Sequence, residues 1–168
     1  MIGLARGLVW VGLTATLCFA GLGCARSERL DSPSHDFSAV TLDGRSLSLS
    51  ELRGRVVLLN FWGTWCGPCR SEIPGLLDLH RELGPRGLTI VAVSVRDDRD
   101  ALLAFVKAKG MTFSVVPDTG IADRYQVQGL PTNILVDRKG RMRYRSLGSG
   151  FGAVRGLRAV AEELLKEP

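Results

Sequence analysis

The order of strand-like and helix-like segments predicts an α/β fold in which a mixed central sheet is flanked by helices. Two nearly continuous apolar runs, residues 54–62 and 87–95, have the length of strands that are buried on both faces. Between them, residues 66–83 space their apolar side chains as a helix does. Residues 131–148 then give two strands around a tight turn, and residues 152–167 give a closing helix.

The other segments complete this pattern. Residues 35–52 alternate polar and apolar side chains around Asp43-Gly44, which predicts a β-hairpin. Residues 97–110 begin with acidic side chains and end in Lys-Gly, as a well-delimited helix does. A short strand is expected over 113–118 and a short helix over 120–127. With 168 residues, 45% of them hydrophobic, the chain has room for one domain with a real core.

The first 23 residues are predicted to be an export signal rather than part of the fold, because no charge occurs between Arg6 and Arg26. The stretch from Ala20 to Cys24 resembles the bacterial lipobox, in which a cysteine is lipidated, although Gly21 stands where the motif prefers a leucine-like residue. A lipoprotein signal ending before Cys24, a retained anchor and an ordinary cleaved signal all remain open. Residues 24–34 are expected to be a polar linker, and residues 35–168 the domain.

The net charge of +5 and the pI near 9.4 do not by themselves indicate a polyanionic partner. Basic residues are scattered along the chain and interleaved with acidic ones. The chain is therefore not expected to bind nucleic acid.

The domain keeps two cysteines, Cys66 and Cys69, which admit three uses: a redox centre, a structural disulfide or half of a metal site. A disulfide across so short a loop removes little entropy from the unfolded chain. A zinc site needs about four ligands, and only His35 and His80 are available besides the pair. The redox use is favoured, with no metal and no cofactor.

Helix chemistry supports that choice. If Cys66 lies at the start of the helix, unpaired backbone N–H groups and the helix dipole lower the pKa of its thiol and make it the nucleophile. Cys69, one turn further along, is then shielded and resolves the mixed disulfide. Pro68 removes an N–H group that the first helical turn does not need.

The segments "FWGTWCGPCRSEIP" and, much later, "GLPTNILVD" resemble the thioredoxin superfamily, in particular its membrane-tethered TlpA/ResA/CcmG-like branch. The resemblance covers residues 35–165 and implies a thioredoxin fold with an N-terminal β-hairpin extension and a central insertion. It also implies that Cys66 attacks, that Cys69 resolves, and that a cis peptide bond precedes Pro131 beside the pair.

The resemblance further implies a surface that binds substrate. In the family, the backbone of the residue before the cis-proline, here Leu130, pairs with an extended substrate segment. Trp65, Gly67 and Pro68 adjoin the nucleophile and are expected to line the same surface, together with Pro131. Trp62, on the strand, is expected in the core.

Two positions separate this chain from plain thioredoxin. Asn60 stands where thioredoxin has a buried aspartate, and an amide cannot act as a base. Glu72, three residues after Cys69, matches a carboxylate that ResA-like proteins place near their cysteines. In a partly apolar site its pKa would be raised, and it could exchange a proton with Cys69. The alternative is a solvated glutamate on the helix surface.

Three arginines, Arg141, Arg143 and Arg145, alternate along one predicted strand. They are expected to share one strand face and to form a solvated sheet edge that prevents aggregation, in preference to a patch that binds a partner.

By resemblance, the chain is expected to be an extracytoplasmic, membrane-attached thiol-disulfide oxidoreductase. Its expected substrates are disulfides of exported proteins, such as the oxidised Cys-x-x-Cys of apocytochrome c, and its expected electron donor is a membrane thiol transporter. A thiol peroxidase of the peroxiredoxin type is one alternative, although Thr64 lies only two residues before Cys66 where that pattern needs three. A tethered chaperone or a module that binds Cu(I) through two thiolates is another.

Overall fold

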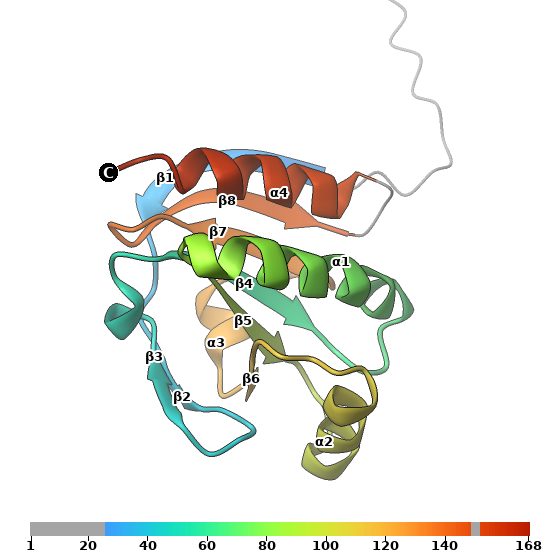
Figure 1. Ribbon diagram of the computed structural model, residues 1–168. Coiled ribbons are helices and arrows are strands. Elements are labelled where there is room, and N and C mark those ends of the chain that lie inside the picture. Colours follow the sequence, from blue (N-terminus) through green and yellow to red (C-terminus); the bar gives the residue numbers. More distant parts are fainter. Residues whose placement is uncertain (1–25, 149–151) are drawn as a thin grey trace, which may run out of the picture.

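The apolar run after Gly54 forms the central strand β4, and all seven of its residues are buried in the computed structural model (Figure 1). The structure describes residues 26–148 and 152–168. The helices and strands follow one another in this order: β1 (Arg26–Pro33), β2 (Ser38–Val40), β3 (Ser46–Ser48), β4 (Val56–Trp62), α1 (Gly67–Leu83), β5 (Leu88–Ser94), α2 (Arg99–Ala108), β6 (Ser114–Pro117), α3 (Ile121–Arg124), β7 (Thr132–Val136), β8 (Arg141–Leu147) and α4 (Ala153–Leu164).

Six strands form one sheet in the order β1-β8-β7-β4-β5-β6. The strands β4, β5 and β6 run parallel to one another. The pairs β4–β7, β7–β8 and β8–β1 are antiparallel. The predicted mixed sheet is therefore confirmed. The predicted hairpin at Asp43-Gly44 is also present, as a separate pair of strands, β2 and β3.

The two faces of the sheet carry two apolar clusters. Helices α1 and α4 cover one face, as Figure 1 shows, and pack on β4 through side chains such as Leu58 and Trp62. The other face packs Phe61 and Val93 against Tyr125, which follows α3, and against Phe37 and Leu49 from the ends of the hairpin segment. The prediction that Trp62 belongs to the core is confirmed, since 1% of it is exposed.

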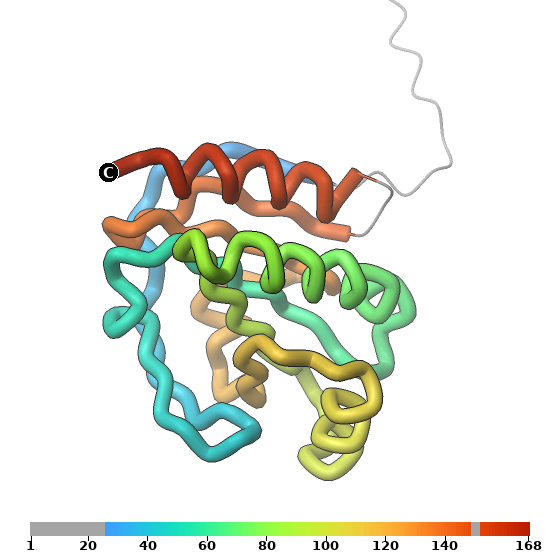
Figure 2. The backbone as a smooth tube through the Cα atoms, in the orientation of Figure 1, coloured from blue at the N-terminus to red at the C-terminus, as the bar shows by residue number. Residues whose placement is uncertain are grey.

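The prediction of a linker over residues 24–34 is wrong for residues 26–33, which form β1 on the outer edge of β8. Figures 1 and 2 both place β1 beside α4. The strand is held by backbone pairing and by ion pairs of Arg29 with Glu163 and of Asp31 with Arg141. Most of its side chains are exposed, so its composition is as polar as that of a linker.

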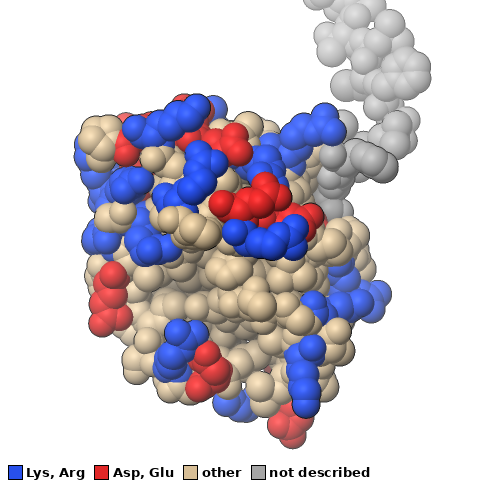
Figure 3. Space-filling model, viewed as in Figure 1, with Lys and Arg blue, Asp and Glu red and all other residues tan. Residues whose placement is uncertain are grey.

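The prediction for the three arginines of β8 is also wrong. The strand is not an edge, because β1 covers it, and a bulge near Val136 breaks the alternation of its side chains. Arg143 pairs with Asp137 and Glu167, whereas Arg145 donates to the backbone oxygen of Tyr125. On the face drawn in Figure 3, acidic and basic side chains are intermixed.

The predicted signal segment, residues 1–23, and Cys24 lie outside the described residues. Within residues 26–148 and 152–168, no helix is long and apolar enough to cross a membrane.

Candidate active site

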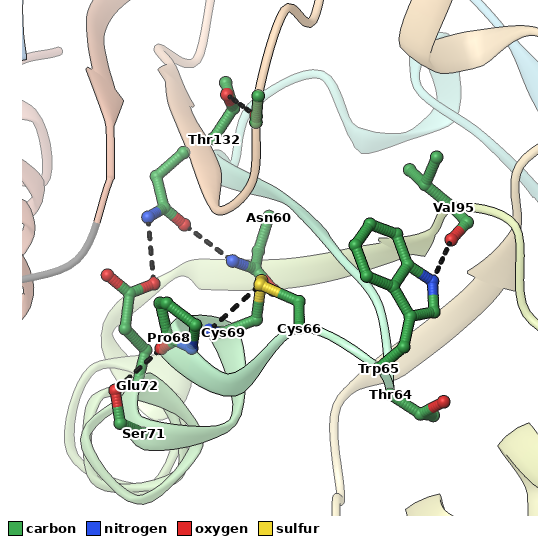
Figure 4. The surroundings of a disulfide bond; sticks show 12 residues. Asn60, Thr64, Trp65, Cys66, Pro68, Cys69, Ser71, Glu72, Val95 and Thr132 are labelled. Carbon is green, nitrogen blue, oxygen red and sulfur yellow. Dashed lines mark hydrogen bonds between the residues drawn. A yellow bond between two sulfur atoms is a disulfide. The ribbon is translucent and has the colours of Figure 1, made fainter.

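The two cysteines lie at the start of α1, where the sequence predicted them. Cys66 is the N-cap residue, with extended backbone angles, and its Sγ accepts a hydrogen bond from the backbone N–H of Cys69 at 3.2 Å. Pro68 lies in the first turn, where its missing N–H leaves no gap in the helix. The two sulfurs form a disulfide bond (Figure 4). A helix N-terminus with its free N–H groups therefore faces Cys66, which favours the thiolate once the bond is reduced.

The two cysteines are both buried, Cys69 slightly more than Cys66. Cys66 is 6% exposed and Cys69 is 2% exposed. The flanking residues Gly67 and Pro68 are exposed. Cys66 is therefore the less buried residue of the pair, and it is flanked by exposed chain.

The predicted cis peptide bond joins Leu130 and Pro131. Leu130 packs against the apolar cluster that contains both cysteines. Strand β7 begins only at Thr132, so Leu130 lies before the ladder that pairs β7 with its neighbours. This geometry brings the cis-proline loop to the same end of the sheet as the cysteine pair.

On one side of the disulfide lies a buried polar chain of three residues. Glu72 is 4% exposed, so it is not a solvated glutamate on the helix surface. Burial raises the pKa of its carboxyl, and a hydrogen bond from Asn133 Nδ2 to Oε2, 3.2 Å long, opposes part of that rise. Asn133 Oδ1 in turn accepts from Asn60 Nδ2 at 2.8 Å. Glu72 is one helical turn after Cys69, on the buried side of the helix.

On the other side of the disulfide, Trp65 is 53% exposed (Figure 4). Its Nε1 donates to the backbone oxygen of Val95 at 3.1 Å, and the Arg96 guanidinium lies 5.3 Å from the centre of its ring. A Cβ atom at position 63 would lie 2.7 Å from Trp65 Nε1, so Gly63 is required for the indole to lie against the backbone. The indole is thus held in place while about half of the residue stays exposed to solvent.

The Asp97 carboxylate holds the loop that leads into the cysteines. Thr64 donates to Asp97 from its backbone N–H, at 3.0 Å, and from its hydroxyl, at 2.5 Å. Ser94 Oγ donates to the same carboxylate. The Thr64 hydroxyl is therefore committed to Asp97.

Asn133 and Asp97 were missed in the sequence. Asn133 is a single polar residue inside the apolar run of β7, and that contrast is the signal that could have found it. Asp97 begins a helix-like segment, so its acidity has an ordinary explanation there. Among the described residues, no group of three or more His, Cys, Asp or Glu side chains is placed to hold a metal ion.

The fold and this site define a thioredoxin-like protein: a mixed sheet, a cysteine pair at a helix N-terminus and a cis-proline loop beside it. A family model described as the AhpC/TSA family matches residues 31–145. The chain belongs to this family and, within the thioredoxin superfamily, to the TlpA/ResA/CcmG-like branch that its motifs predicted.

The relatives agree with this placement. The chain is 39% identical over 118 residues to the thiol-disulfide oxidoreductase ResA of Bacillus subtilis; the match covers 69% of this chain and 65%, slightly less than two thirds, of that protein. A thiol:disulfide interchange protein of Chlorobium tepidum superposes with a TM-score of 0.74 at 26% identity, covering 82% of this chain and 99% of that one. A DsbF homologue from Corynebacterium diphtheriae gives 0.75 at 29% identity, covering 87% and 98%.

Proposed function

We propose that the chain is a thiol-disulfide oxidoreductase that reduces disulfides of exported proteins through Cys66 and Cys69. The observation that carries this proposal is the position of the pair: Cys66 caps the helix and is the less buried of the two cysteines, and Cys69 lies in the first turn behind it. A dithiol arranged in this way can attack with one sulfur and resolve with the other.

The reaction takes place in two exchanges. The Cys66 thiolate attacks one sulfur of the substrate disulfide; a bond forms between Cys66 and that sulfur, and the second substrate sulfur leaves as a thiolate that takes up a proton. Cys69 then attacks Cys66 Sγ, which closes the Cys66–Cys69 disulfide and releases the first substrate sulfur as a thiol. Two electrons have passed to the substrate, and an external dithiol must return them before the next turnover.

Glu72 supplies the proton transfer of the second exchange. Cys69 must lose its proton before it can attack, and its burial disfavours a free thiolate. A carboxylate one turn away, whose pKa burial raises, is a stronger proton acceptor than an exposed glutamate. Glu72 returns the accepted proton to Cys69 when the dithiol is regenerated.

Substrate recognition is assigned to the exposed rim of the site. Trp65, Gly67 and Pro68 offer an apolar and largely backbone surface next to Cys66. Leu130, ahead of the β7 ladder and next to Pro131, offers backbone groups to an extended peptide. Such a surface recognises an extended segment around a disulfide rather than a small molecule.

We place the activity outside the cytoplasm, with attachment to the membrane through a lipid at Cys24 or through a retained N-terminal anchor. The uncharged N-terminal stretch supports export. One structural neighbour, 29% identical, is described as a secreted thiol-disulfide isomerase of Corynebacterium glutamicum. The oxidised Cys-x-x-Cys of apocytochrome c is the proposed substrate, and a membrane thiol transporter is the proposed electron donor.

Two measurements test this function. The domain beginning at Arg26 should reduce insulin or a peptide with an oxidised Cys-x-x-Cys when dithiothreitol is supplied, and failure on both substrates overturns the proposal. In cells, the full chain carrying Cys69→Ser should accumulate a mixed disulfide at Cys66, and identification of the captured protein names the substrate.

A peroxidase is disfavoured by the Thr64 hydroxyl, which is bound to Asp97 and so is not free to serve a peroxide at Cys66. Peroxide consumption by the reduced chain measures this alternative. The non-catalytic alternative, a chaperone or copper module, is measured with the double variant Cys66→Ser, Cys69→Ser, which should lose all function if the chain is an oxidoreductase.

A further inference from the structure

The buried amides of Asn60 and Asn133 form a cross-strand pair beside the redox centre. They lie directly opposite each other in the antiparallel ladder between β4 and β7, and both are buried. Nothing in the two-exchange reaction uses them. An amide pair in an apolar layer is costly unless its polar atoms are matched, so the pair needs an explanation.

The hydrogen bonds of the pair have one consistent direction. Glu72 Oε2, as a carboxylate, can only accept, so Asn133 must point its Nδ2 at it and its Oδ1 at Asn60. Asn60 then donates to that oxygen. Asn60 therefore fixes which end of the Asn133 side chain faces Glu72, although Asn60 does not touch Glu72 itself.

The chain of hydrogen bonds also distinguishes the two oxygens of Glu72. Oε2 is occupied by Asn133, whereas Oε1 is buried and has no partner among the described residues. A proton that arrives at Glu72 is accordingly best accommodated on Oε1. Figure 4 shows Glu72 on the side of the disulfide away from Trp65.

We propose that Asn133, oriented by Asn60, is a positioning residue that holds Oε2 of Glu72 and leaves Oε1 to exchange the proton of Cys69. The inference rests on the proposed function and adds to it the two amides that orient the Glu72 carboxylate, the proposed proton acceptor. Asn60, which stands where thioredoxin has an aspartate, thereby acts through an amide relay: the acidic group lies on the helix and the strand supplies its orientation.

The other groups around Glu72 leave this role to Asn133. From α1 the titratable neighbour is the Cys69 thiol, and β4 and β7 contribute the two neutral amides. From α4, Val154 packs against α1 at Gly75, and Arg155 is exposed. Arg158 pairs with Glu82, which lies nearly three turns beyond Glu72 on α1. Tyr144 of β8 packs in the apolar cluster that contains Cys66 and Cys69.

The test follows the second exchange by itself. The reduced chain is mixed with an aromatic disulfide whose thiolate is coloured; the first release reports the attack by Cys66, and the second reports the attack by Cys69. Loss of the Asn133 donor leaves Glu72 harder to ionise, so Asn133→Leu should slow the second release about tenfold at the acid end of its pH profile. At the alkaline end, where the Cys69 thiol ionises unaided, the rate should stay within about twofold of the parent chain.

Asn60→Leu tests the orientation without removing Asn133 and without placing a new ionisable group beside the cysteines. When the Asn60 donor is lost, Asn133 can turn and present Oδ1 to the Glu72 carboxylate. The acid end of the second release should then slow, by no more than in Asn133→Leu. Leucine is close to asparagine in size, so this variant carries the test if Asn133→Leu does not fold.

Ser146→Ala is the matched control. Ser146 lies opposite Asn133 on β8, is buried, and its hydroxyl has no partner among the described residues. Its pH profile should coincide with that of the parent chain.

A loss of rate that is the same at every pH in Asn133→Leu, or an unchanged profile in both asparagine variants, would overturn the inference. Carbon NMR titration of Glu72 in the oxidised chain gives a readout without turnover, and its midpoint should rise in both variants. Because neither measurement uses a protein substrate, failure to reduce insulin would reject the proposed function and leave this result standing.

Discussion

The two sides of the Cys66–Cys69 disulfide are built in opposite ways. On the side of Glu72, the three hydrogen-bonded polar side chains, Glu72, Asn133 and Asn60, are all buried and come from three separate elements, α1, β7 and β4. On the side of Trp65, the indole is open to solvent and is held by one backbone oxygen and one guanidinium. In the proposed function, this difference separates proton transfer, which needs a buried and fixed carboxyl, from recognition, which needs an exposed surface.

The largest effect is expected from replacing Cys66, whose sulfur lies between the two sides. Cys66→Ser should reduce insulin turnover to the background of dithiothreitol alone, since the hydroxyl is a far weaker nucleophile than a capped thiolate. Cys69→Ser should instead retain the first exchange and accumulate the mixed disulfide. The comparison fails if Cys69→Ser and Cys66→Ser give the same products by mass spectrometry.

Glu72→Gln breaks the buried side alone. The glutamine cannot accept the proton of Cys69, so the resolving step should slow about 10²-fold at neutral pH, the low end of what a positioned base contributes. The rate of the first exchange should stay within about twofold. Stopped-flow mixing with the aromatic disulfide separates the two steps, and equal slowing of both would argue that Glu72 merely supports the fold.

Trp65→Ala breaks the exposed side alone. Removing a contact aromatic from a recognition surface should raise the KM for a Cys-x-x-Cys peptide about tenfold and leave the pH dependence of the resolving step unchanged. Arg96→Ala, which removes only the cation over the ring, should raise the KM about twofold. A shifted pH profile in either variant would mean that the two sides are not independent.

The smallest effect concerns stability. A carboxyl whose pKa is higher in the folded chain than in the unfolded one binds its proton more tightly when folded, so it opposes folding above the folded pKa. That cost disappears as the pH falls below the unfolded pKa. Glu72→Gln should therefore raise the Tm by a few degrees at pH 8 and by little at pH 4. Calorimetry of the oxidised chain checks the sign, and a lower Tm at pH 8 would contradict it.

Much of this arrangement could be predicted from the sequence because it depends on local rules. Cys66 as a helix cap follows from the strand that ends at Trp62 and from Pro68 in the first turn. The position of Glu72 near the cysteines came from the family resemblance, and its burial was one of two alternatives that the sequence left open. The cis bond at Pro131 came from the family resemblance and not from spacing.

The rest depends on which strands lie side by side, and composition does not encode that. Asn60 and Asn133 are 73 residues apart, so their pairing appears only when the register of β4 and β7 is known. The edge strand β1 was missed for a similar reason, since backbone pairing holds a polar segment that composition alone assigns to a linker. The bulge in β8 likewise reverses faces that strict alternation would keep together.

In the proposed function, Cys66 attacks and Cys69 resolves. This division is tested most directly by the order in which the two thiols react with an alkylating reagent. The reduced chain is treated with less than one equivalent of iodoacetamide near neutral pH, and the labelled cysteine is located by peptide mass spectrometry. We predict that the label is found on Cys66, which caps the helix and is the less buried cysteine, and that Cys69 stays unmodified until the chain is unfolded. Labelling of Cys69 at an equal or greater rate would contradict the account.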